Sequence, residues 1–189
     1  MTASAVNPDA LVVAVEPVSR IFDKLKENVS LNGDRTKTVR AAISEYTGTA
    51  ILFDLPEEEH VLSVSLEPDW NKNGKGIQPV EVPCLTVADL LARFDATKVD
   101  LLKIDVETHE AAVLRGFLEV LRRDKPTLLI ELLNDNVAAE VAQLIGGLGY
   151  LYFNIDDVTW PPLQTKTLTK SSHFNFLICQ PEVARSIGL

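Results

Sequence analysis

Three acidic residues and a histidine lie close together near the middle of the chain, at Asp105, Glu107, His109 and Glu110. Carboxylates and imidazoles act as general bases, and an imidazole titrates near neutral pH. Carboxylate oxygens also bind divalent cations, although we do not expect a metal site here. Acids that follow a strand can instead stabilise the N-terminus of the next helix, and Glu110 fits that role. We therefore assign possible catalytic roles to Asp105, Glu107 and His109.

An apolar segment of strand type directly precedes these residues, over positions 99–104. A strand that is apolar throughout is typical of a parallel sheet with helices on both faces. In such sheets ligands bind just beyond the carboxyl ends of the strands. From residue 110 onward, apolar residues recur at helical spacing, at Val113, Leu114, Phe117, Val120 and Leu121. The acidic residues are therefore predicted to lie where a strand ends and a helix begins.

Strand-like and helix-like segments alternate along most of the chain. The predicted strands are residues 11–15, 38–43, 99–104, 126–132, 150–155 and 174–179. Ser19 is the expected N-cap of the first long helix, and Thr86 is that of a later helix ending near Phe94. This alternation predicts one α/β domain over residues 1–189, with helices on both faces of its sheet. Residues 44–84 break the alternation and are expected to form an antiparallel addition or lid.

Composition limits the classes of function. The 189 residues are 46% apolar and 24% charged, with a net charge of −9. Such an acidic chain is a poor match for broad nucleic-acid or anionic-membrane binding, since both require a basic surface. The longest apolar run falls far short of the ~20 residues of a membrane span. Cys84 and Cys179 form no CxxC pair and indicate free thiols in a reducing compartment. Because the N-terminus lacks the form of a signal peptide, we expect a cytoplasmic protein.

Several motifs occur in an order that resembles one known family. They are VEPVSRIFDKLKENVSLNG from Val15, AAIS at 41–44, PCLTVADLL from Pro83, VDLLKIDVETHEAAVLRG at 99–116, LLIEL at 128–132 and FNFLI at 174–178. In this order and spacing they resemble the FkbM-type S-adenosylmethionine-dependent methyltransferases. The resemblance extends from about residue 11 to residue 179. It implies a Rossmann-like class I methyltransferase sheet.

The resemblance also implies which residues bind S-adenosylmethionine. The family's ribose-binding acid corresponds to Glu16, which is followed by Pro17. A carboxylate accepts two hydrogen bonds from a vicinal diol, as in dinucleotide-binding folds. Ala42 and Ile43, at the end of the next strand, are expected to line the adenine. Asp105 is expected near the methionine end of the cofactor and the methyl acceptor.

By the same resemblance, the reaction is methyl transfer to a small molecule or sugar, at a hydroxyl group. Transfer from a sulfonium to oxygen is an in-line displacement that needs positioning and a nearby base. Asp105, Glu107 and His109 are the candidates for that base. The family usually has glycine where this chain has Thr108 and a small residue where it has His109. Glycine permits positive φ, which threonine disfavours.

One family feature is missing from this sequence. The family's first strand carries a D-x-G-A-x-x-G turn, expected roughly twenty residues before the ribose-binding acid from strand and helix lengths. Here fifteen residues precede Glu16, and none is glycine. We therefore expect an N-terminally incomplete sheet with two open edges, which favours a homodimer or larger assembly. The alternative to an enzyme is a degenerate or truncated module without catalysis that acts through association.

Overall fold

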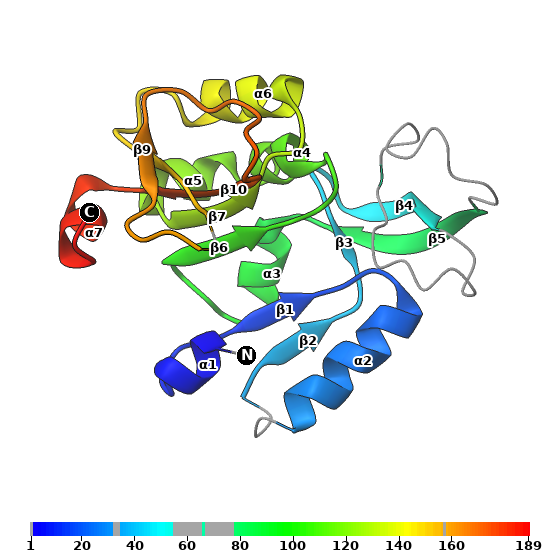
Figure 1. Cartoon of the computed structure of the whole chain (residues 1–189). Helices are drawn as coiled ribbons and strands as arrows, with labels where there is room; N and C mark the ends of the chain where they lie inside the picture. Colours follow the sequence, from blue (N-terminus) through cyan, green and yellow to red (C-terminus); the bar gives the residue numbers. More distant parts are fainter. Residues whose placement is uncertain (1, 32–34, 55–65, 67–77, 157) are drawn as a thin grey trace.

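The structure is a computed structural model that describes residues 2–31, 35–54, 66, 78–156 and 158–189. Its described strands form three sheets, with two, five and three strands (Figure 1). The two-stranded sheet pairs β1 (Val13–Val15) with β2 (Lys37–Val39) in parallel. The helix α2 (Ser19–Ser30) connects them. Val18 is the N-cap of α2, so the prediction that Ser19 caps this helix is wrong.

The three-stranded sheet is built mainly from the segment predicted as an addition. Its strands are β3 (Ala42–Ile43), β4 (Gly48–Asp54) and β5 (Gln78–Leu85), in the order β3-β5-β4. Strand β4 runs antiparallel to β5, as expected for an antiparallel addition, and β3 runs parallel to β5. Within the segment predicted as an addition, residues 55–65 and 67–77 lie outside the described residues.

The five-stranded sheet has the order β6-β7-β10-β8-β9. Its strands are β6 (Leu101–Ile104), β7 (Thr127–Glu131), β8 (Leu151–Asn154), β9 (Leu163–Thr165) and β10 (Asn175–Cys179). Only β6 and β7 pair in parallel, because β10 runs antiparallel to both of its neighbours. Four of these strands match predicted segments, whereas β9 lies outside all of the predicted strands.

The larger hydrophobic core lies between this sheet and the helices that follow β6 and β7. The remaining helices are α1 (Thr2–Val6), α3 (Val87–Arg93), α4 (Glu110–Arg115), α5 (Leu118–Asp124), α6 (Asp135–Ile145) and α7 (Pro181–Ser186). Leu114, Leu121, Leu128 and Val141 are fully buried in this core. Burial of each such side chain contributes about 1.5–3 kcal/mol to the stability of the fold, so this core holds α4 against the sheet that contains β6.

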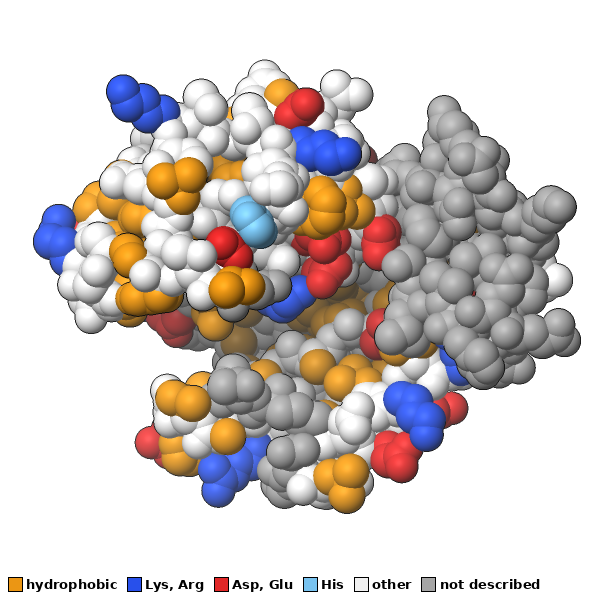
Figure 2. All heavy atoms as spheres, viewed as in Figure 1, with side chains coloured by type: hydrophobic (Ala, Val, Ile, Leu, Met, Phe, Trp, Pro, Cys, Tyr) orange, Lys and Arg blue, Asp and Glu red, His pale blue; other side chains and the backbone are white. Residues whose placement is uncertain are grey.

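Strands β1 and β6 each have one partner among the described strands, so both are edge strands. In the view of Figure 2, the surface is hollowed between the part that holds β1, β2 and α2 and the part that holds the five-stranded sheet. Hydrophobic side chains gather along this hollow. The architecture is α/β, as predicted. The strands on which the predicted site depends, however, belong to separate sheets.

Candidate functional site

The turn between β6 and α4 carries the predicted catalytic residues, and its backbone is unusual. Glu107 and Thr108 have φ angles of 51° and 78°, in the left-handed region. A β-branched residue rarely adopts this conformation, because its Cβ approaches the following carbonyl oxygen. The chain therefore adopts positive φ at two consecutive residues, neither of which is glycine. Surrounding contacts must stabilise such a turn.

Glu110 lies at the centre of this turn and is fully buried. Its Oε1 accepts hydrogen bonds from the backbone N–H groups of Val106 and Thr108, at 3.3 and 3.2 Å. Its Oε2 is buried without a hydrogen-bond partner in the described part of the chain. Burial raises the pKa of the Glu110 carboxyl to about 7, the backbone donors oppose that rise, and the charge of Glu131 adds to it.

Asp105, at the end of β6, is exposed and bonded to a cation. Lys103 donates to its Oδ2 at 2.6 Å. Glu131, at the end of the neighbouring strand β7, has its pKa raised by burial and further by Asp105 and Glu107. Three carboxyl groups thus meet beyond the ends of β6 and β7. The raised pKa means that the Glu131 carboxyl holds a proton more readily than an isolated glutamate does.

His109 connects the turn to a distant part of the chain. Its Nε2 lies 2.8 Å from the hydroxyl Oγ of Ser44, which is buried next to β3. The backbone also approaches closely there, since a Cβ added at Gly116 would lie 2.3 Å from the carbonyl oxygen of Ser44. Arg115 adds ion pairs to Glu45 at 2.7 Å and to Glu140 at 2.9 Å. The Ser44 hydroxyl thus occupies one nitrogen of the predicted base.

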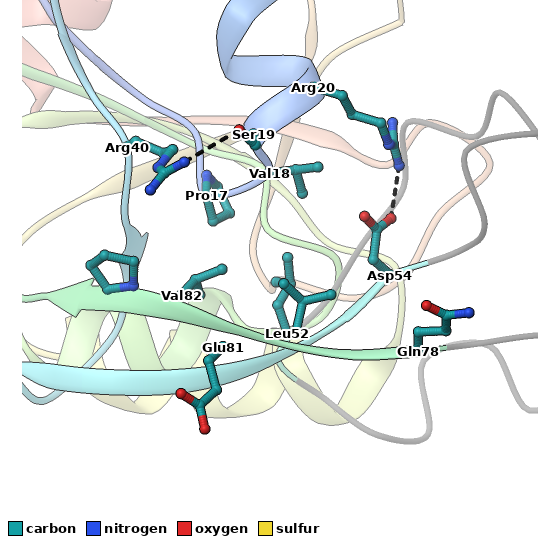
Figure 3. Close-up of a pocket in the computed structure, with 12 residues that line it drawn as sticks. Pro17, Val18, Ser19, Arg20, Arg40, Leu52, Asp54, Gln78, Glu81 and Val82 are labelled. Carbon is teal, nitrogen blue, oxygen red and sulfur yellow. Dashed lines mark hydrogen bonds and ion pairs between the residues drawn. The ribbon is translucent and has the colours of Figure 1, made fainter.

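A pocket of about 330 Å³ opens where β1 leads into α2 (Figure 3). Pro17 and Val18 line one side, and Leu52 and Val82 of the β4–β5 hairpin line the other. Two arginines bring charge to its rim, since Arg20 pairs with Asp54 at 2.7 Å and Arg40 donates to Ser19 Oγ at 3.2 Å. The pocket has apolar walls and a polar rim, as is usual for small-molecule sites.

Glu16 directly precedes Pro17, the first of the residues that line this pocket. Its Oε1 accepts a hydrogen bond of 2.7 Å from the backbone N–H of Val18. Burial raises the pKa of the Glu16 carboxyl, the Val18 N–H and the Arg20 charge oppose that rise, and Asp54 adds to it. The carboxylate is half-buried and retains acceptor capacity for a ligand.

The predicted site residues fall into two groups. Asp105, Glu107 and His109 share the turn after β6, and Glu16 and Pro17 lie beside the pocket after β1. Ala42 is 4% exposed in the small core around Val18, and Ile43 packs against the larger core. Among the described residues, no three His, Cys, Asp or Glu side chains are placed to hold a metal ion.

Sequence reasoning did not single out three of the residues that complete these groups. Ser44 reaches His109 across 65 positions of sequence, and no local pattern indicates that contact. Arg20 and Asp54 are 34 positions apart, and their pairing depends on how α2 packs on the hairpin. The only available signal for Ser44 was its place at the end of the AAIS motif.

None of the described helices is both long and apolar enough to cross a membrane. No curated protein matches the chain. Among solved structures, the chain is similar in fold to a methyltransferase FkbM from Methylobacillus flagellatus KT, determined by crystallography at 2.20 Å resolution. The two are 14% identical with a TM-score of 0.54, and the similarity covers 93% of this chain and 38% of that protein. The chain therefore spans well under half the length of this solved relative.

Residues 2–152 match the family described as the methyltransferase FkbM domain. The matched range includes both groups of site residues, from Glu16 at the pocket to Asp105 and His109 in the turn after β6. It covers far more than half of the chain. The chain belongs to the FkbM methyltransferase domain family.

Proposed function

We propose that this domain binds S-adenosylmethionine and transfers its methyl group to a hydroxyl of a small molecule or sugar. The observation that carries the proposal is the presence of two groups of acids, each following a strand. The half-buried Glu16 follows β1, next to the residues that line the pocket, and the carboxyl-rich turn follows β6. Both groups lie within the range that matches the family.

The donor set fits such a cofactor at both ends. The Glu16 carboxylate provides oxygen acceptors for the two ribose hydroxyls, and Pro17 offers an apolar surface beside them. The exposed carboxylate of Asp105 provides an acceptor for the ammonium group of the methionine end. Residues 1–15 contain no glycine, and we assign the methionine carboxylate to Lys103, the cation beside Asp105.

S-adenosylmethionine supplies a methyl group made electrophilic by its sulfonium. The acceptor oxygen forms a bond to the methyl carbon as the carbon–sulfur bond breaks, and the hydroxyl proton must leave. Asp105, Glu107 and His109, in the turn after β6, are the candidates for the group that takes this proton.

The second candidate function is a module without catalysis that acts through association. The edge positions of β1 and β6 favour it, because unpaired strand edges bind other strands. We propose a homodimer in either case. Light scattering tests this, and a strictly monomeric protein at micromolar concentration would exclude it. Cys84 and Cys179 are both free and buried, which supports a reducing, cytoplasmic location.

Calorimetric titration with S-adenosylhomocysteine separates the two functions. The enzyme proposal predicts measurable binding and at least a tenfold loss of affinity in Glu16→Gln. Glu81→Gln is the matched control, since Glu81 is an acid that lines the pocket but its side chain points away from it (Figure 3). Absence of binding at high micromolar ligand, or equal affinity in both variants, would leave the association module as the better account.

A further inference from the structure

The turn between β6 and α4 holds two consecutive non-glycine residues in the left-handed region, Glu107 and Thr108. Each costs free energy relative to ordinary backbone, so the turn persists only if other contacts favour it. The φ angles at these residues also set where Asp105 and His109 point, because both flank them. Whatever holds this backbone therefore controls the geometry of the proposed transfer site.

The buried carboxyl of Glu110 is the group placed to do this. Its single oxygen Oε1 accepts from Val106 N and Thr108 N, the two amides on either side of Glu107. Its second oxygen, Oε2, is buried and has no hydrogen-bond partner in the described part of the chain. Burying a carboxyl with one unsatisfied oxygen lowers the stability of the folded protein. A role other than packing is therefore needed to explain this residue.

The end of the turn, at His109, is held by a contact with another segment of the chain. His109 Nε2 meets Ser44 Oγ at 2.8 Å, and Ser44 N donates to Leu85 O at 3.0 Å, which ties the segment after β3 to β5. The His109 ring thus reports the position of the turn. If the backbone at Thr108 relaxes, the contact between His109 and Ser44 must lengthen or break.

We propose that Glu110 is a positioning residue, whose buried carboxyl holds the left-handed turn so that Asp105 and His109 are correctly placed at the end of β6. The inference rests on the proposed function, since it assigns Glu110 a part in the same site. Glu110 acts through the backbone of Val106 and Thr108 and touches no reacting atom.

Two substitutions of similar size separate positioning from packing. Glu110→Gln keeps an oxygen that can accept from Val106 N and Thr108 N. Glu110→Met fills the same volume without an acceptor and suits an apolar environment, so it should fold. Glu119→Gln, on the exposed face of α5, is the control. Glu110→Met combined with Thr108→Gly tests rescue, because glycine adopts positive φ unaided.

The readouts are thermal unfolding, the ring chemical shifts of His109 by NMR at fixed pH, and calorimetric binding of S-adenosylhomocysteine. We expect Glu110→Met to fold cooperatively, to shift the His109 signals but not those of His173, and to weaken binding at least tenfold. Glu110→Gln and the control should stay within twofold of the unmodified protein. The double variant should recover the His109 shifts.

Unchanged His109 shifts in folded Glu110→Met, or no recovery in the double variant, would overturn the positioning role. Loss of binding in Glu110→Gln equal to that in Glu110→Met would do the same. If the unmodified protein binds no S-adenosylhomocysteine while the His109 shifts respond as described, the proposed function fails and the positioning of the turn by Glu110 stands. The two inferences are thereby tested separately.

Discussion

Replacing Thr108 by glycine should stabilise the protein, although it removes a side chain. Thr108 has φ 78° and is only partly buried. The left-handed conformation costs an L-residue about 1–2 kcal/mol relative to glycine. Glycine also lowers the free energy of unfolding by about 0.5–1 kcal/mol, because it increases the conformational freedom of the unfolded chain. The free energy of unfolding should therefore rise by about 0.5–1 kcal/mol.

Urea denaturation and thermal unfolding measure this change, and for a domain of this size it corresponds to a Tm increase of about 1–4 °C. Two controls isolate the backbone effect. Thr108→Ala removes most of the side chain but keeps Cβ, so it should give little gain. Thr127→Gly, in strand β7 at a position without positive φ, should destabilise by about 1 kcal/mol. If Thr108→Gly is no more stable than Thr108→Ala, the claim that the backbone at Thr108 is strained is refuted.

Three further substitutions test other parts of the structure. Gly116→Ala should destabilise by about 1–3 kcal/mol in urea denaturation, because its Cβ would lie 2.3 Å from the Ser44 carbonyl oxygen and force the backbone apart; near-neutral stability would refute that close approach. Thr86→Ala should cost about 1 kcal/mol by the same assay, since it removes the capping box that Thr86 forms with Asp89 at the start of α3; an unchanged midpoint would count against the cap. Glu110→Gln should change the pH dependence of stability. Because folding raises the pKa of Glu110 from 4.5 to about 7, the folded state binds more protons in this window, and stability falls as pH rises through it, by at most about 3 kcal/mol. In Glu110→Gln this decrease in stability with rising pH should disappear, while the contribution of Glu131 remains in both proteins. Parallel pH profiles of stability for the two proteins would contradict the raised pKa of Glu110.

Local signals in the sequence predicted much of the secondary structure. Thr86 caps α3 as expected, because a capping box depends on residues three positions apart. Ser19 was predicted as the N-cap of α2, yet Val18 holds that position and Ser19 Oγ accepts a hydrogen bond from Arg40 instead. The Glu16 carboxylate accepts the Val18 N–H, so the backbone donor of the N-cap residue is bonded to an acid two positions earlier. Tertiary contacts decided between two plausible starts that differ by one residue.

The division into three sheets could not be predicted, because strand pairing joins segments far apart in sequence. Alternating strands and helices indicated one sheet, whereas β1–β2 and the five-stranded sheet share no ladder in the described part of the chain. The acids after β6 were located from the sequence, but not their different roles. Glu110 was expected to assist the start of α4, and it is the acid in the first turn of that helix. Its carboxyl also closes the turn before α4, which could not be predicted because burial cannot be read from its position alone.

The most direct test of the proposed function is a crystal structure of the protein with S-adenosylhomocysteine. We expect both ribose hydroxyls to bond to the Glu16 carboxylate beside Pro17, and the amino-acid end to lie against Asp105 in the turn after β6. A nucleoside bound away from Glu16, or no ligand at millimolar concentration in crystals that leave the pocket open, would contradict it.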